Sequence, residues 1–190
     1  MDITQFERRP NAADYIAGYR DAPRFEILCR QCPRYNTTWH CPPYDFSTLE
    51  AVSQYRHVHL FATKVSLTPQ ERQQDTAALY QQVMQRVWDI THPQLMRLEA
   101  QYPGSLTFGM ACRLCGDAPC TRTKGLPCRH PDQMRHSIES FGFDMAKTAQ
   151  DIFGIPMLWG KDGQAPEYLI FITALFTNHD MPNSQTTPQT

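Results

Sequence analysis

The chain has 190 residues, which is enough for one domain to bury a real hydrophobic core without covalent staples. Its 18 basic side chains nearly balance 19 acidic ones, giving a formal net charge of -1, so we expect no binding to nucleic acid or to an anionic membrane. The first residues lack the apolar run of a secretory signal, and no stretch has the apolar length of a membrane span. We therefore expect a cytoplasmic protein.

The N-terminal third predicts three short elements. Residues 13 to 20 predict a helix, and Arg24 to Leu28 predict a short extended segment that leads into a group of cysteines. The segment from His57 to Leu67 alternates apolar with more polar residues and is rich in branched and aromatic side chains, which is typical of a half-buried strand.

A long helical pattern opens at Thr68-Pro69. Its apolar stripe consists of Leu79, Val83, Val87 and Ile90. Because proline lacks a backbone N–H, His92-Pro93 predicts either an end or a kink of this helix. The helix is expected to pack on the sheet.

The C-terminal half predicts two strands and a helix. Leu106 to Met110 predict a strand, and residues 144 to 153 a helix that Asp144 caps and Gly154 stops. The apolar run from Tyr168 to Phe176 predicts a central strand. The polar, proline-bearing segment 178–190 is expected to be a disordered tail.

Together these elements predict one α+β domain over residues 1–177. We expect a small, mostly antiparallel sheet packed by the long helix, with helices on one side and cysteine-rich loops at the edge.

The seven cysteines fall into two groups. The first group is Cys29, Cys32 and Cys41, and the second is Cys112, Cys115, Cys120 and Cys128. Clustered thiols in a chain without export features are more often metal ligands or redox groups than disulfides, and the odd count argues against a closed disulfide framework. Four thiols suffice for a tetrahedral ion or a four-iron cubane, so the second group is the stronger indication of metal.

Two features bear on the identity of the metal. Cys32 and Cys41 each precede a proline, as does the last cysteine of bacterial ferredoxin motifs, which favours an iron-sulfur cluster, with 4Fe-4S as the expected type, over zinc. Basic residues also exceed acidic ones around the cysteines, and they would stabilise an anionic site of either kind. These basic residues are Arg30, Arg34, Arg113, Arg122, Lys124, Arg129 and Arg135. Zinc remains the alternative.

The first group lacks a fourth cysteine. His40 could complete its coordination, or an iron could stay open to water or substrate. The plainer interpretation is that these cysteines join other residues in one structural site, or that one of them is a buried free thiol.

The cysteines stand in longer motifs that resemble a known family. The pattern C-x-x-C-P-x-Y-x-x-x-W-x-C-P-P-Y spans Cys29 to Tyr44, C-x-L-C begins at Cys112, and C-R-H-P-x-x-x-R-x-S-x-E-x-x-G-x-D spans Cys128 to Asp144. This combination resembles a family of prokaryotic predicted metal-binding proteins of unknown function. The resemblance implies metal binding by the same cysteines and supplies no reaction.

Other conspicuous residues allow two interpretations. Arg135 could donate to a cluster sulfur or hold an anion, and Glu139 could move a proton, whereas Gly142 and Asp144 are interpreted as a positive-φ turn and a helix cap. The aromatic residues Tyr35, Trp39 and Tyr44 could wall a pocket, although packing explains them as well. His57 and His59 share one strand face but are not predicted to be ligands.

Three functions follow from these observations. The first is an iron-sulfur protein that transfers electrons to a redox partner protein, with Arg113, Arg129 and Arg135 tuning the cluster. The second is an enzyme whose open-site cluster acts on a small anionic ligand. The third is a zinc-stabilised structural or interaction module.

Overall fold

The structure is a computed structural model that describes residues 1–181. Its elements in chain order are β1 (Asp2–Arg8), α1 (Ala12–Tyr19), α2 (Ala22–Arg30), α3 (Thr48–Ser53), β2 (His57–Ser66), α4 (Pro69–Arg72), α5 (Thr76–Gln101), β3 (Leu106–Gly109), the 3-10 turn η1 (Thr121–Lys124), β4 (His136–Ser137), the 3-10 turn η2 (Glu139–Phe141), α6 (Met145–Phe153) and β5 (Tyr168–Thr177). The α+β class is therefore confirmed.

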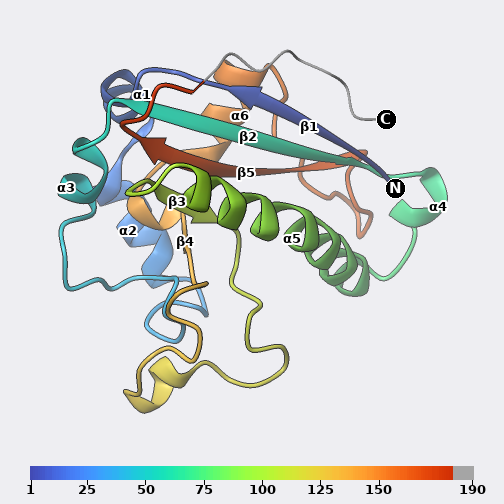
Figure 1. Cartoon of the computed structure of the whole chain (residues 1–190). Coiled ribbons are helices and arrows are strands. Elements are labelled where there is room, and N and C mark those ends of the chain that lie inside the picture. The colour runs from blue at the N-terminus through green and yellow to red at the C-terminus, as the bar shows by residue number, and fades with distance from the viewer. Residues whose placement is uncertain (182–190) are drawn as a thin grey trace.

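One five-stranded sheet forms the centre, in the order β1-β2-β5-β3-β4. All neighbouring strands are antiparallel except β3 and β4, which are parallel. The long helix α5 runs along one face, and α1 and α6 cover the other (Figure 1). The prediction of helices on one side only was wrong, because both faces of the long central strands are apolar.

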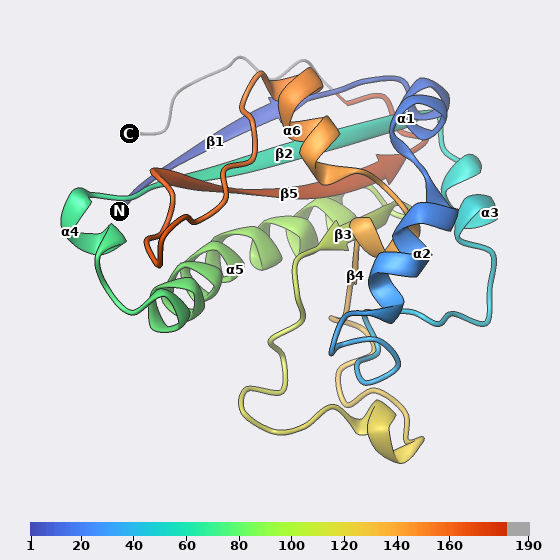
Figure 2. The same ribbon diagram turned by 180° about the vertical axis from the view of Figure 1, so that it is seen from behind.

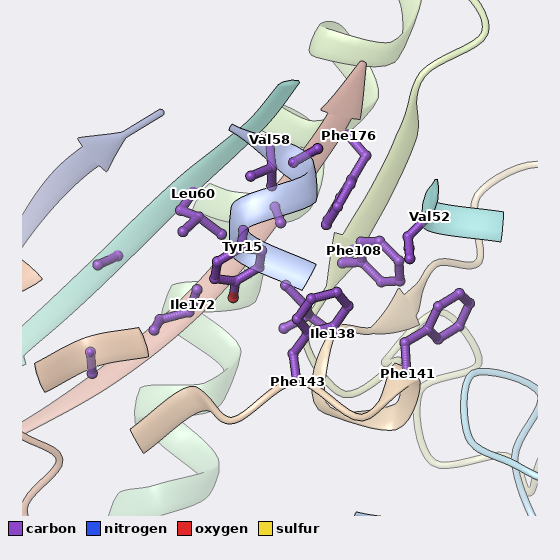
Figure 3. Close-up of a cluster of buried hydrophobic side chains, with 14 of the residues drawn as sticks. Tyr15, Val52, Val58, Leu60, Phe108, Ile138, Phe141, Phe143, Ile172 and Phe176 are labelled. Carbon is purple, nitrogen blue, oxygen red and sulfur yellow. The ribbon is translucent and has the colours of Figure 1, made fainter. Parts of the chain in front are cut away.

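The larger apolar core lies between the sheet and α1, α6 and η2. Figure 3 shows aromatic and aliphatic side chains from these elements converging there. The ring of Tyr15 stacks on that of Phe143 with centroids 5.0 Å apart, and its hydroxyl forms a 3.0 Å hydrogen bond with that of Thr148. A second core joins Val65 and Leu169 to the buried stripe of α5.

Several predicted elements are confirmed. The structure contains the helix predicted over 13 to 20, the strands predicted at 57–67, 106–110 and 168–176, and the long helix. However, β2 is almost fully buried rather than half buried, because β1 and β5 flank it and helices cover both faces.

The prediction of an extended segment from Arg24 to Leu28 was wrong. These residues lie in α2, whose N-terminus is capped by the side chain of Asp21, which accepts a 3.2 Å hydrogen bond from the backbone N–H of Arg24. Pro23 in the first turn favours the same start. The helix preference of the cap and the proline outweighs the preference for extended structure of the branched and aromatic residues that follow.

The long helical pattern is divided and its stripe is shifted. Thr68 caps only the short α4, and Asp75 caps α5, which continues past Pro93. The buried stripe advances every four residues, as Leu79, Val83, Val87, Thr91 and Leu95. Ile90 is therefore 39% exposed, which corrects its predicted place in the stripe.

The first residue of the predicted tail, Asn178, forms hydrogen bonds with the domain. Asn178 accepts a 2.9 Å hydrogen bond from the backbone N–H of Arg56 and donates one to the carbonyl of Gln54. The part of the tail from residue 182 to 190 lies outside the described residues.

Candidate metal centre

Both cysteine-bearing loops leave the sheet region on the same side. Figure 1 and Figure 2 show, from opposite directions, that the loop after α2 and the loop between β3 and β4 lie together beneath the sheet. The first loop carries Cys32 and Cys41 and follows Cys29 at the end of α2, and the second carries the four-cysteine group. The cysteine-rich loops thus form one lobe.

All four cysteines of the second group line one cavity of about 440 Å³. The first loop contributes Arg34, Thr38, Trp39 and His40 to the same wall, and α5 contributes Gln81 and Gln85. Because one water molecule takes about 30 Å³ of liquid volume, the space is far larger than a single small ion requires.

Tight turns shape the second loop around this cavity. The backbone N–H of Gly116 donates to the carbonyl of Arg113 at 3.1 Å, and that of Ala118 donates to the carbonyl of Cys115 at 3.1 Å. The backbone N–H of His130 donates to the sulfur of Cys128 at 3.4 Å. Such N–H donors to sulfur stabilise thiolates that bind metal.

The Cys112 thiol is influenced by burial and by the other three thiols of this group. Burial raises the pKa of Cys112, and the neighbouring Cys115, Cys128 and Cys120 raise it further, whereas a backbone hydrogen bond from Leu114 opposes the rise. Without metal the Cys112 thiol is thus protonated at neutral pH. A bound cation would displace the proton and relieve the repulsion between thiolates.

The three-cysteine group gathers at the end of α2. The backbone N–H of Cys32 donates to the carbonyl of Cys29 at 3.0 Å, which turns the chain back toward the helix end. Burial raises the pKa of Cys29 to about 11, and Cys41, Glu26, Glu139 and Cys32 each raise it further. The thiols of the first group therefore lie near one another and near two carboxylates.

Glu139 lies close enough to this first group for its charge to raise the pKa of Cys29 and of Cys41. Surrounding protein raises the pKa of its carboxyl group, although the residue remains accessible to solvent. Its segment η2 is fixed to α2, because a Cβ on Gly142, which has a φ of 92°, would lie only 2.7 Å from the Cα of Ala22. The predicted positive φ of Gly142 is confirmed, and it allows this close approach.

Arg122 joins the two loops. Its guanidinium group donates to the carbonyl oxygens of Thr38, Cys41 and Pro43 in the first loop and lies over the ring of Trp39, 5.2 Å from the centroid. In return, the indole N–H of Trp39 donates to the carbonyl of Leu126 in the second loop at 3.1 Å. The two cysteine groups are therefore held as one unit.

His40 is the most deeply buried polar residue of this unit. It is 2% exposed, and its Nδ1 is sealed from solvent with no hydrogen-bond partner among residues 1–181. Burial lowers the pKa of His40 to about 4, so the ring is neutral at neutral pH. The structure places it on the wall of the four-cysteine cavity.

The predicted arginines have different environments. Arg113 lines the cavity and donates to the side-chain oxygens of Gln85 and Gln81 at 2.7 and 3.2 Å. Arg129 donates to the carbonyl of Pro119 at 2.9 Å. Arg135 pairs with Glu99 and also donates to Thr107, so its charge is already compensated.

Two arginines that line the cavity have no ion-pair partner. Within the described range, Arg34 and Arg113 form no ion pair, and the acidic Asp117 lines the same cavity. Four thiolates around a metal carry net negative charge, which these guanidinium groups would balance. The donor set, the cavity and the unpaired arginines therefore fit an anionic metal-thiolate group.

The candidate ligand side chains do not converge on a single point. Among residues 1–181, no group of three or more His, Cys, Asp or Glu side chains is close enough to hold one metal ion. The assignment of the seven cysteines as ligands stays a prediction. His57 and His59 lie away from the cavity, where His57 contacts Asp180 and His59 contacts Glu7.

Asp144 acts as the predicted helix cap. Its side chain accepts a 2.9 Å hydrogen bond from the backbone N–H of Lys147, and Gly154 ends α6 with a φ of 69°. Tyr44 packs against Phe141 and His136, and its hydroxyl donates to the carbonyl of His40 at 2.7 Å. Packing therefore accounts for Tyr44.

Sequence reasoning missed how the two loops share a cavity. It considered His40 only for the three-cysteine group and treated Arg122 only as nearby charge. The sole sequence sign was that both residues lie within cysteine motifs, and their contacts join positions about 80 residues apart.

The chain is similar to a known protein family. A family model described as "Predicted metal-binding protein (DUF2284)" matches residues 17–176. No curated protein and no solved structure matches. Among the described residues, none of the helices combines the length and apolar character needed to cross a membrane.

Proposed function

Because the chain belongs to the DUF2284 family of predicted metal-binding proteins, we propose that it holds an iron-sulfur cluster in the four-cysteine cavity and uses it for electron transfer. The observation that carries this proposal is the lining of one cavity by Cys112, Cys115, Cys120 and Cys128, beside arginines without carboxylate partners.

The size of the cavity favours a cluster over zinc. A tetrahedral zinc with sulfur ligands at about 2.3 Å draws four sulfurs to within about 3.8 Å of one another. A cubane instead takes its four thiolates on four different irons, so the sulfurs are spread around a larger volume. A space of about 440 Å³ accommodates the second arrangement.

The protein would contribute binding, charge balance and shielding. The four cysteines would hold the cluster, Arg34 and Arg113 would offset its negative charge, and Trp39 would limit its contact with water. When bound, a 4Fe-4S cluster supplies a one-electron redox couple. Electron transfer implies a redox partner protein.

Anaerobic purification followed by iron and sulfide analysis tests this proposal. We expect brown protein that loses iron and sulfide in Cys112→Ser and in Cys128→Ser. A matched Ser→Ala change at Ser53, on a helix remote from the cysteine loops, should leave both contents unchanged. Colourless protein with stoichiometric zinc would refute the iron assignment and support a zinc-stabilised module.

A second candidate function rests on the three-cysteine group. This group has three cysteines with Glu139 nearby, so a cluster bound by them would keep one iron available to a small anionic substrate. A carboxylate at this position could accept or deliver a proton. The test is to add phosphate or citrate and record the spin-resonance signal in the wild type and in Cys29→Ser. Without an anion response that depends on Cys29, this candidate fails.

A further inference from the structure

His40 belongs to the first loop but lies at the cavity of the second. Its backbone is fixed, because the carbonyl of His40 accepts hydrogen bonds from the hydroxyl of Tyr44 at 2.7 Å and from Nδ1 of His136 at 3.4 Å. His40 is therefore held at the cavity that the four thiols also line, by contacts that do not use its ring nitrogens.

The two ring nitrogens of His40 have different surroundings. Nδ1 is buried without a hydrogen-bond partner, whereas Nε2, which also forms no hydrogen bond within residues 1–181, is not sealed in this way. Leaving a buried polar group unsatisfied costs about 1–3 kcal/mol, so the environment of each nitrogen decides where the ring keeps its hydrogen.

The tautomer decides what the ring can offer. A neutral imidazole carries one N–H. On Nδ1 this N–H would be sealed without an acceptor, whereas on Nε2 it can point to whatever fills the cavity. The favoured form thus presents an N–H donor to the cavity and buries only a lone pair.

We propose that the Nε2–H of His40 donates a hydrogen bond to a sulfur atom of the cluster bound by the four cysteines of the other loop. The inference rests on the proposed function. Since four cysteines already supply a full set of ligands, the ring acts as a donor and is not a ligand. A hydrogen bond to cluster sulfur stabilises the more negative, reduced state and so raises the reduction potential.

Redox titration followed by spin resonance tests this on the full-length, anaerobically purified protein. His40→Phe should shift the midpoint potential to more negative values while iron and sulfide contents stay at wild-type levels. His40→Gln, which keeps an N–H near the same place, should shift it less. His59→Gln, a change at a buried histidine on β2 that does not line the cavity, should leave the potential unmoved.

A second measurement takes its main result from the wild-type protein. Wild-type protein labelled with ¹⁵N-histidine should show weak nitrogen coupling to the reduced cluster, and His40→Gln should lose it. Strong coupling, typical of a directly bound nitrogen, or no coupling at all, would overturn the donor role. If the wild type is brown and His40→Phe has the same midpoint potential, this inference alone is overturned. If the purified protein is colourless and contains zinc, the proposed function is overturned as well.

Discussion

The side chain of Arg122 connects the two cysteine-bearing loops. Its guanidinium group serves three carbonyl oxygens of the first loop and stacks on Trp39, while its backbone belongs to the second loop. Arginine suits this task because its donors form a fixed planar fork. The geometry of one cysteine-bearing loop therefore depends on the other.

Replacing Arg122 tests this dependence. Arg122→Met should release iron to a ferrous chelator about tenfold faster than wild type, because the first loop loses its main attachment, equivalent to about 1.4 kcal/mol. The measurement is the rate of colour formation by the chelator. Arg129→Met is the control, because Arg129 donates to one carbonyl of its own loop. Equal rates in both variants would argue against a coupled unit.

Three histidines near the lobe are kept neutral. Burial lowers the pKa of His40 to about 4 and lowers the pKa of His92 and His136 below the ordinary 6.5. Around pH 5 to 6 the unfolded chain therefore binds protons that the folded chain does not. By linkage, the free energy of unfolding falls as pH decreases from 7 toward 4.

His136→Phe should weaken this pH dependence. The phenyl ring retains the contacts with Tyr44 and Phe141 but removes one group that takes up a proton on unfolding. Urea unfolding of wild type and variant at pH 7 and pH 5 measures the change. A variant that loses as much stability as wild type between these pH values would contradict the assignment.

Helix α5 shows what a sequence pattern can and cannot specify. Leu79, Val83 and Val87 were predicted correctly as the buried stripe, because any helix with this spacing presents them on one face. The prediction for the next position of the stripe was wrong, since Thr91 rather than Ile90 is buried. Thr91 tolerates burial because its hydroxyl donates to the carbonyl of Val87 at 2.8 Å.

Mutations can test which face of α5 is buried against the sheet. Val87→Ala should lower the free energy of unfolding by about 2 kcal/mol, since it opens a cavity against the sheet. Ile90→Ala, at a position 39% exposed, should change it by less than about 0.5 kcal/mol. Chemical denaturation of the two variants gives both values. If Ile90→Ala lowered the free energy of unfolding more than Val87→Ala, Ile90 would belong to the buried stripe, as the sequence predicted.

Other elements depended on contacts distant in sequence. Strand β1, with the sequence DITQFER, is too polar to predict a strand, and it forms because β2 offers it an antiparallel edge. Strand β4 has only two residues, His136 and Ser137, and pairs in parallel with β3. Neither strand has a local sequence pattern from which it could be predicted.

At the scale of the whole molecule, the sheet holds the cysteine-rich lobe at one edge. Strands β3 and β4 bound the four-cysteine loop, and α2, fixed to η2 by the Gly142 contact, presents the three-cysteine group. The sequence predicted the two cysteine groups as candidate ligands, because cysteine spacing is local, and that assignment stays a prediction. The shared cavity could not be predicted, because it depends on how two distant loops pack together.

X-ray absorption at the iron edge of the anaerobically purified protein tests the central claim most directly. The account predicts iron with a sulfur shell near about 2.3 Å and a second shell of iron neighbours, both lost when the four-cysteine loop is mutated. Iron surrounded only by nitrogen and oxygen, or zinc with a single sulfur shell in place of iron, would contradict it.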